Sequence, residues 1–183
     1  TMTTIFSRLF KKANAPKDQP SSSLFSTLSV NWRQFQKSQL EPFITPDAPA
    51  VVIAFVSPHL AFHDVAKTLR SSLPTETKLA VASTAGELFQ NTEKNQPLYL
   101  STPKEGWHNV VLAFFSKDMF CAIDLFWVHL PKECNTASAR IEQLVQNLSE
   151  VTPSFSIRQD DTLALTFFNG LVGAENLFME AVY

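Results

Sequence analysis

The stretch AVVIAFVSPHLAFHDVAKTLRSSLPTETKLAVA, residues 50–82, determines the fold class. It opens with a continuous β-branched and aromatic run, residues 50–56, which is typical of a strand covered on both faces. Apolar residues then recur at helical spacing over 62–73, and residues 78–82 form a second short strand run. A strand–helix–strand unit of this kind places its two strands parallel, with a right-handed crossover.

Further apolar runs extend this unit into a mixed sheet. Residues 110–115 and 119–128 are separated by a short polar loop, which predicts an antiparallel hairpin. Another strand is predicted over 162–168, and helical periodicity marks 141–148 and 174–182. We therefore predict an α/β fold with a mixed β-sheet, a parallel βαβ start, a central antiparallel hairpin and helices packed on the sheet faces.

The residues before this body differ in composition. Residues 1–23 contain basic side chains followed by a Pro- and Ser-rich stretch, which predicts a flexible basic N-terminal arm and linker. Residues 24–49 carry an apolar stripe at helical spacing and then three prolines, which predicts an N-terminal helix and a Pro-rich connection. The globular domain is expected to occupy residues 50–183.

Composition excludes several functional classes. Hydrophobic residues make up 45% of the chain and charged residues 17%, so the chain is expected to fold. A formal net charge of -2 offers no positive field for nucleic acid. No apolar run reaches the roughly 20 residues of a membrane span, and the N-terminus lacks a secretory signal pattern. A cytoplasmic protein without a membrane span or disulfide framework is predicted.

Catalytic signatures are missing from the sequence. There is no G-x-S-x-G elbow, P-loop, dinucleotide fingerprint, CxxC pair or H-E-x-x-H motif. Ser57 and Ser83 follow strand runs, but the sequence pairs neither with an activating base. We expect a protein that is not an enzyme.

The end of the second predicted strand is the first candidate site. Thr84 and Glu87 fit a capping box, in which the hydroxyl and the carboxylate satisfy backbone N–H groups at a helix start. The same place is the carboxyl end of a parallel strand, where N–H groups favour an anionic ligand group. Ser83, Thr84 and Gly86 are therefore candidate ligand contacts, and the structural and ligand roles are compatible.

Two further positions are candidates of the same kind. Asn169 and Gly170 form a turn after the strand at 162–168, and they would reach the same sheet edge if that strand runs parallel to the first two. Purely structural turn chemistry is the alternative. Asp124 interrupts an otherwise apolar strand face, which indicates either an exposed edge or a ligand-facing carboxylate.

Metal and haem sites have weaker support. His59 and His63 have the i, i+4 spacing of a metal pair on a helix, but no Cys or Glu stands at a matching distance, so a solvated helix face is favoured and no metal site is predicted. No haem attachment motif is present, and haem is not expected to be ligated from within this chain. The candidate axial donors would be His59, His63, His108, His129, Met119 and Cys121.

Three segments resemble the N-terminal half of the FIST family of bacterial sensory domains: residues 51–69, 78–89 and 161–182. The resemblance rests on three motifs: Ser-Pro after the first strand, Ser-Thr-Ala-Gly-Glu after the second, and Gly-Leu-x-x-x-Glu near the end. Many members have Gly-Cys where this chain has Val81-Ala82, so a role that depends on that thiol does not carry over. Because a C-terminal half normally follows in the family, the resemblance implies a truncated module.

The resemblance implies a small-ligand-sensing input domain of a cytoplasmic bacterial signal-transduction protein, chemoreceptor-like or kinase-associated. The expected ligand is a small molecule such as an amino acid, and the expected partner is a downstream signalling module or histidine kinase. One alternative within the family is a haem-binding nitric oxide sensor. The other is a protein–protein interaction scaffold without a small ligand, acting through the segment around Trp32 or through exposed apolar surface.

Overall fold

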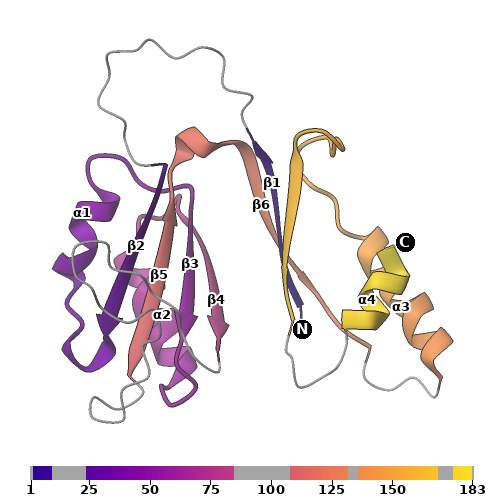
Figure 1. Ribbon diagram of the computed structural model, residues 1–183, viewed down its shortest axis with the longest axis horizontal. Coiled ribbons are helices and arrows are strands. Elements are labelled where there is room, and N and C mark those ends of the chain that lie inside the picture. The colour runs from indigo at the N-terminus through magenta and orange to yellow at the C-terminus, as the bar shows by residue number, and fades with distance from the viewer. Residues whose placement is uncertain (1, 10–23, 85–107, 132–135, 169–174, 183) are drawn as a thin grey trace, which may run out of the picture. The chain divides into compact units, whose positions relative to one another are not determined.

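The computed structural model describes residues 2–9, 24–84, 108–131, 136–168 and 175–182. The chain divides into two compact units (Figure 1). The sheet unit, Asn14–Met119, holds the strand–helix–strand stretch. The split unit combines Thr1–Ala13 with Phe120–Tyr183.

A four-stranded sheet forms the centre of the sheet unit, with strand order β2-β5-β3-β4. β3 (Val51–Val56) and β4 (Lys78–Ser83) are parallel neighbours, and α2 (Phe62–Ser72) connects them. β5 (Asn109–Phe115) pairs antiparallel with β3. The predicted α/β class and its parallel βαβ start are therefore confirmed.

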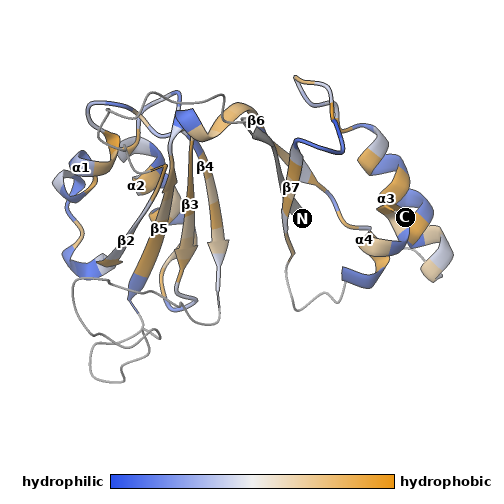
Figure 2. Ribbon diagram, turned by 45° about the horizontal axis from the view of Figure 1, so that its top comes forward, coloured by the Kyte–Doolittle hydropathy of each residue, from blue (hydrophilic) through white to orange (hydrophobic). Residues whose placement is uncertain are grey.

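Both faces of β3 are buried, as its uninterrupted apolar sequence predicted. Val52, Ala54 and Val56 point into the main core, while Val51 and Ile53 are buried on the other face. Figure 2 shows hydrophobic residues along most of β3 and β5. The main core combines alternate residues of the strands with the apolar stripe of α2: Val30, Leu40, Val52, Ala54, Val56, Val65, Leu69, Leu73, Val110, Leu112 and Phe114.

Side-chain hydrogen bonds fix the connection from α2 to β4. The Arg70 guanidinium donates to the carbonyl oxygens of Leu73, Pro74 and Thr77, which satisfies acceptors beyond the helix end. The buried Thr77 donates from Oγ1 to the carbonyl oxygen of Pro49 over 2.9 Å. Because Pro49 precedes β3 and Thr77 precedes β4, this bond ties together the starts of the two parallel strands.

Replacing Thr77 with valine is expected to lower the free energy of unfolding by about 1–3 kcal/mol, because the buried carbonyl of Pro49 loses its donor while side-chain volume is kept. Thr77→Ser retains the hydroxyl and is the matched control. Urea denaturation of both variants measures the difference. Equal stability of the Val and Ser variants would show that the hydroxyl is not required.

The segment before β3 differs from its prediction. Instead of a helix over 24–40, the structure has β2 (Phe25–Asn31), followed by two short 3-10 turns, η1 (Trp32–Gln34) and η2 (Lys37–Leu40), and a short helix α1 (Glu41–Ile44). β2 pairs antiparallel with β5, so cross-strand pairing prevails over the helical spacing. The sheet therefore begins well before residue 50.

The split unit is built on a second sheet with strand order β6-β1-β7. β1 (Met2–Leu9) pairs antiparallel with both β6 (Phe120–Val128) and β7 (Thr162–Phe167). The prediction of a flexible arm is thus wrong for residues 2–9, while the rest of the arm and linker, residues 10–23, lies outside the described part. β6 and β7 both run opposite to β1, so their carboxyl ends lie at the same edge of this sheet.

The predicted central hairpin is also wrong. β5 and β6 are separated only by Ser116 and the 3-10 turn η3 (Lys117–Met119), but they join different sheets instead of pairing with each other. A short polar loop permits a hairpin but does not enforce one, and here β5 pairs with β2 and β3 while β6 pairs with β1.

Two helices complete the split unit. α3 (Ala137–Ser149) is preceded by its N-cap Thr136, whose hydroxyl accepts from the N–H of Ala139, and α4 (Glu175–Val182) follows β7 along the chain. Their apolar residues pack with the end of β6 in a smaller core around Val128, Leu130 and Leu144. No helix in the described ranges is long and apolar enough to cross a bilayer.

Candidate functional site

The candidate site is the edge of the four-stranded sheet at which β3 and β4 end, here called the carboxyl edge. The N–H of Thr84 donates to the carbonyl oxygen of Val56 over 3.0 Å, which continues the parallel ladder past β4. The N–H of Ser57 donates to the carbonyl oxygen of Asn109 over 3.2 Å. Ser57, Thr84 and Asn109 are thus held together on adjacent strand ends.

The connection from β3 to α2 is compact at this edge. Ser57 is only 2% exposed, and its carbonyl oxygen accepts from the N–H of Leu60 over 3.1 Å. α2 then begins at Phe62 without a side-chain cap on its N-terminal N–H groups. Such a helix start favours an anionic group through its dipole and its free donors.

His108 adds a polar group to the carboxyl edge. Its carbonyl oxygen accepts from the N–H of Trp32 over 2.7 Å, and Asn31 stands opposite Asn109 in the β2–β5 register. The Nδ1 atom of His108 is buried and has no hydrogen-bond partner. The sequence pattern indicated His108 only as a haem donor and neither asparagine, because Asn109 reaches this edge through β3–β5 pairing and Asn31 through β2–β5 pairing.

Of the predicted contacts after β4, two are placed by the structure. Ser83 is the last residue of β4, is exposed, and pairs in register with Val56. Thr84 is partly exposed beside it. Gly86 and the remainder of the predicted capping box lie outside the described residues.

The predicted turn after β7 does not join this edge. Asn169 and Gly170 themselves lie outside the described residues, but β7, which precedes them, belongs to the β6-β1-β7 sheet. The condition under which this turn would reach the same sheet edge, a strand parallel to β3 and β4 in their sheet, is therefore not met. The sequence of a strand alone does not determine which sheet that strand joins.

Asp124 lies in β6, in the split unit, and has a partner from within the chain. Its Oδ2 atom accepts from the backbone N–H of Ser154 over 2.7 Å and from the Ser154 hydroxyl over 2.8 Å. Ser154 belongs to the segment between α3 and β7, called the strap here and comprising residues 150–161. The observed geometry makes Asp124 the anchor of the strap, while its ligand role stays a prediction.

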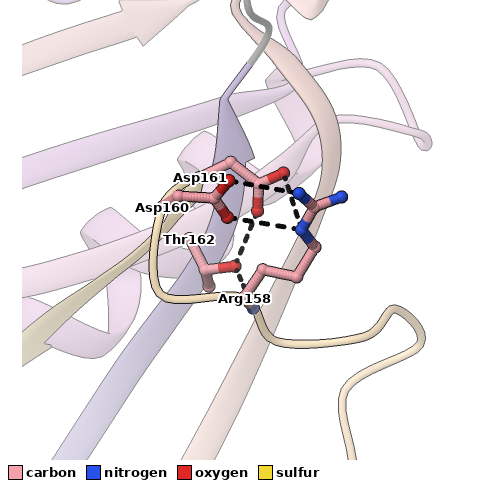
Figure 3. A network of polar contacts seen from close by, with 4 residues as sticks. All are labelled: Arg158, Asp160, Asp161 and Thr162. Atoms are coloured by element: carbon pink, nitrogen blue, oxygen red, sulfur yellow. Dashed lines mark hydrogen bonds and ion pairs between the residues drawn. The ribbon is translucent and has the colours of Figure 1, made fainter.

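The end of the strap is closed by a local charge network (Figure 3). The Arg158 guanidinium donates to both carboxylate oxygens of Asp160, over 3.3 and 3.1 Å, and its backbone N–H donates to the Thr162 hydroxyl over 2.9 Å. The hydrogen bond and charge of Asp160, followed by the charge of Asp161, raise the pKa of Arg158. The hydrogen bonds and ion pairs drawn in Figure 3 connect residues within 158–162, so they stabilise the turn before β7.

The histidine spacing does not form a metal pair. His63 is in α2, whereas His59 is in the turn before that helix, so the two do not share a helix face, and both are exposed. A search of the described residues finds no group of three His, Cys, Asp or Glu side chains that could hold a metal ion.

Four of the six candidate haem donors lie at the surface of the chain. His59, His63, His129 and Cys121 are exposed, so a macrocycle bound to any of them would remain in water instead of in an apolar pocket. Cys121 is a free cysteine. Of the other two donors, His108 has a buried Nδ1 atom without a hydrogen-bond partner, and Met119 is partly buried.

Comparison with known protein families gives a match. The family model described as the FIST N domain matches residues 50–183, which is most of the chain. No curated protein and no solved structure matches. The matched range begins just before β3, so it includes both parallel strands and the residues at their carboxyl ends.

Proposed function

Since this chain belongs to the FIST family, whose members are generally sensory domains in signal transduction, we propose that it binds a small metabolite such as an amino acid at the carboxyl edge. The observation that carries this proposal is the parallel pairing of β3 and β4, which brings Ser57, Ser83 and Thr84 to the carboxyl edge. In open α/β sheets, ligands bind outside the carboxyl ends of parallel strands.

The side chains at the carboxyl edge suit a small polar ligand. The described side chains there are hydroxyls, amides and imidazoles: Asn31, Ser57, His59, Ser83, Thr84, His108 and Asn109. The start of α2 has no side-chain cap, so its N–H groups suit a carboxylate, while the Asp64 carboxylate in the same turn and the backbone and amide oxygens suit an ammonium group. An amino acid carries both of these groups, which is why we propose this ligand class.

Binding would act by shifting a conformational equilibrium. Ligand that contacts both the β4 end and the β3–α2 connection favours the conformation in which those two segments are together. A downstream signalling module or histidine kinase would read this difference. We propose that this happens in the cytoplasm of a bacterium, and that the domain binds its ligand without chemical turnover.

The proposal is tested by thermal unfolding of the chain with each of the twenty amino acids, one at a time. A binder present at about a hundred times its Kd stabilises the folded state by about 2.7 kcal/mol, which gives a clear rise in Tm. No rise with any amino acid would contradict the proposed ligand class.

Variants at the carboxyl edge test whether the ligand binds there. Thr84→Val removes a hydroxyl at the edge and is expected to weaken binding of the active amino acid about tenfold. Thr75→Val is the matched control, because Thr75 is an exposed turn residue between α2 and β4. Equal affinity of the two variants for the amino acid would show that the Thr84 hydroxyl does not contact the ligand.

A second candidate, the interaction scaffold, has one observation in its favour. Trp127 of β6 is 59% exposed, and Leu163 and Leu165 of β7 are 53% and 41% exposed. By the registers with β1 these residues lie on one sheet face. A scaffold predicts no amino-acid stabilisation, and that a Trp127→Ser variant loses a copurifying partner.

A further inference from the structure

Arg140 is a partly buried cation without a counter-ion. It is the fourth residue of α3, and its Nε atom is buried with no hydrogen-bond partner. Among the described residues, no carboxylate forms an ion pair with its guanidinium. Buried charged groups in proteins are normally paired, because removing the charge from water is costly.

The other described arginine side chains are accounted for. The Arg70 guanidinium donates to three backbone carbonyls, and the Arg158 guanidinium pairs with Asp160. Arg33 is exposed to solvent. Arg140 alone among the described arginine side chains combines partial burial with the lack of any acceptor.

The position of Arg140 is defined by its neighbours along α3. Leu144, one turn further on and on the same side of the helix, is buried with Val128 and Leu130 at the end of β6. The Asn147 side chain donates to the carbonyl oxygen of His129 over 2.8 Å. α3 therefore lies against the end of β6, with Arg140 toward the helix start.

This end of β6 is a sheet edge shared with β7. Both strands run antiparallel to β1, with Val128 opposite Met2 and Phe167 opposite Thr3. Phe168, just past β7, contacts Phe178 of α4 with ring centroids 5.0 Å apart. The first turn of α3 adds a positive helix-dipole potential to the guanidinium charge.

We propose that Arg140 binds an oxyanion, a carboxylate or a phosphate group of a small molecule, at the shared carboxyl end of β6 and β7. A planar guanidinium matches either group with paired N–H donors. The ligand then supplies the negative charge that pairs with the guanidinium, in place of a carboxylate of the protein. This site lies in the split unit, and the inference does not depend on the proposed ligand at the end of β3 and β4.

The test measures the Arg140 side chain directly. In a ¹H–¹⁵N spectrum of the chain, the Nε–H signal of Arg140 is identified by its loss in Arg140→Met. Succinate and inorganic phosphate are then titrated separately, with sodium chloride at matched ionic strength as the control. Saturable movement of this signal with one probe and not with chloride is expected, and the responding probe distinguishes a carboxylate from a phosphate.

Thermal unfolding provides the second readout. Arg140→Met is expected to have an unchanged or higher Tm without ligand, because it removes an uncompensated charge, and to bind the responding probe at least about tenfold more weakly. Arg158→Gln is the matched control, since it removes one paired and exposed guanidinium from the same unit and should retain the affinity for the probe.

Two results would overturn the assignment. One is an Nε–H signal of Arg140 in the unsubstituted chain that follows neither probe. The other is a folded Arg140→Met protein with a lower Tm and undiminished probe affinity, which would assign Arg140 a structural role. If Arg140→Met does not fold, the signal in the unsubstituted chain, identified instead with Arg140→Lys, decides the question.

Discussion

Replacing Leu112 with alanine is expected to lower the free energy of unfolding of the sheet unit by about 2–5 kcal/mol. Leu112 is 1% exposed and lies in β5, between β2 and β3. Its side chain packs in the main core, which also contains Leu69 of α2. Truncation loses the apolar burial of several carbon atoms and leaves a cavity that paired strands on both sides cannot close.

Chemical denaturation followed by a probe in the sheet unit measures this loss. Leu165→Ala is the matched control, because Leu165 is also a strand leucine but lies largely exposed on β7, and its truncation is expected to cost well under 1 kcal/mol. Equal losses for the two variants would contradict the assignment of β5 to the centre of the sheet.

Replacing Asp124 with alanine is expected to release the strap and lower stability by about 1–3 kcal/mol, because two hydrogen bonds to an ionised carboxylate are lost. Hydrogen exchange at the Ser154 amide is the most sensitive measurement, since this N–H donates directly to Asp124. Its protection should fall in Asp124→Ala and be partly retained in Asp124→Asn, which keeps an acceptor oxygen.

Asp47→Ala is the control for the loss of an exposed aspartate, and it should leave Ser154 exchange unchanged. If Asp124→Ala also leaves Ser154 protection unchanged, the carboxylate does not anchor the strap. In that case, a ligand-facing role for Asp124 would gain support.

The parallel pair was predictable because its information is local. A strand run covered on both faces, an amphipathic helix and a second strand follow one another within residues 50–82. The crossover of such a unit is almost always right-handed, with the two strands parallel. The placement of Ser83 at the end of β4 follows from the same unit. The family resemblance was confirmed over residues 50–183.

The sheet partners were not predictable because they depend on contacts between distant residues. β1 and β6 are separated by more than a hundred residues in the chain, yet they pair along their lengths. β2 reads as a helix from the spacing of Phe25, Leu28 and Trp32, and becomes a strand because β5 offers a free edge. These long-range pairings also separate β5 from β6.

The missed site residues have the same cause. Asn109 is the first residue of β5, and its hydrogen bond with Ser57 follows from antiparallel β3–β5 pairing, which the sequence pattern did not specify. Arg140 looked like an ordinary surface residue of an amphipathic helix. Only the packing of α3 against the end of β6 reveals its buried nitrogen.

The central claim, that a small polar ligand binds at the end of the parallel strands, is tested most directly by amide chemical shifts. A ¹⁵N-labelled chain is titrated at constant pH with an equimolar mixture of the twenty amino acids. The account predicts saturable shifts that are largest at the amides of Ser57, Thr84 and Asn109. Spectra that do not change at these residues, or change only at residues of the split unit, would contradict it.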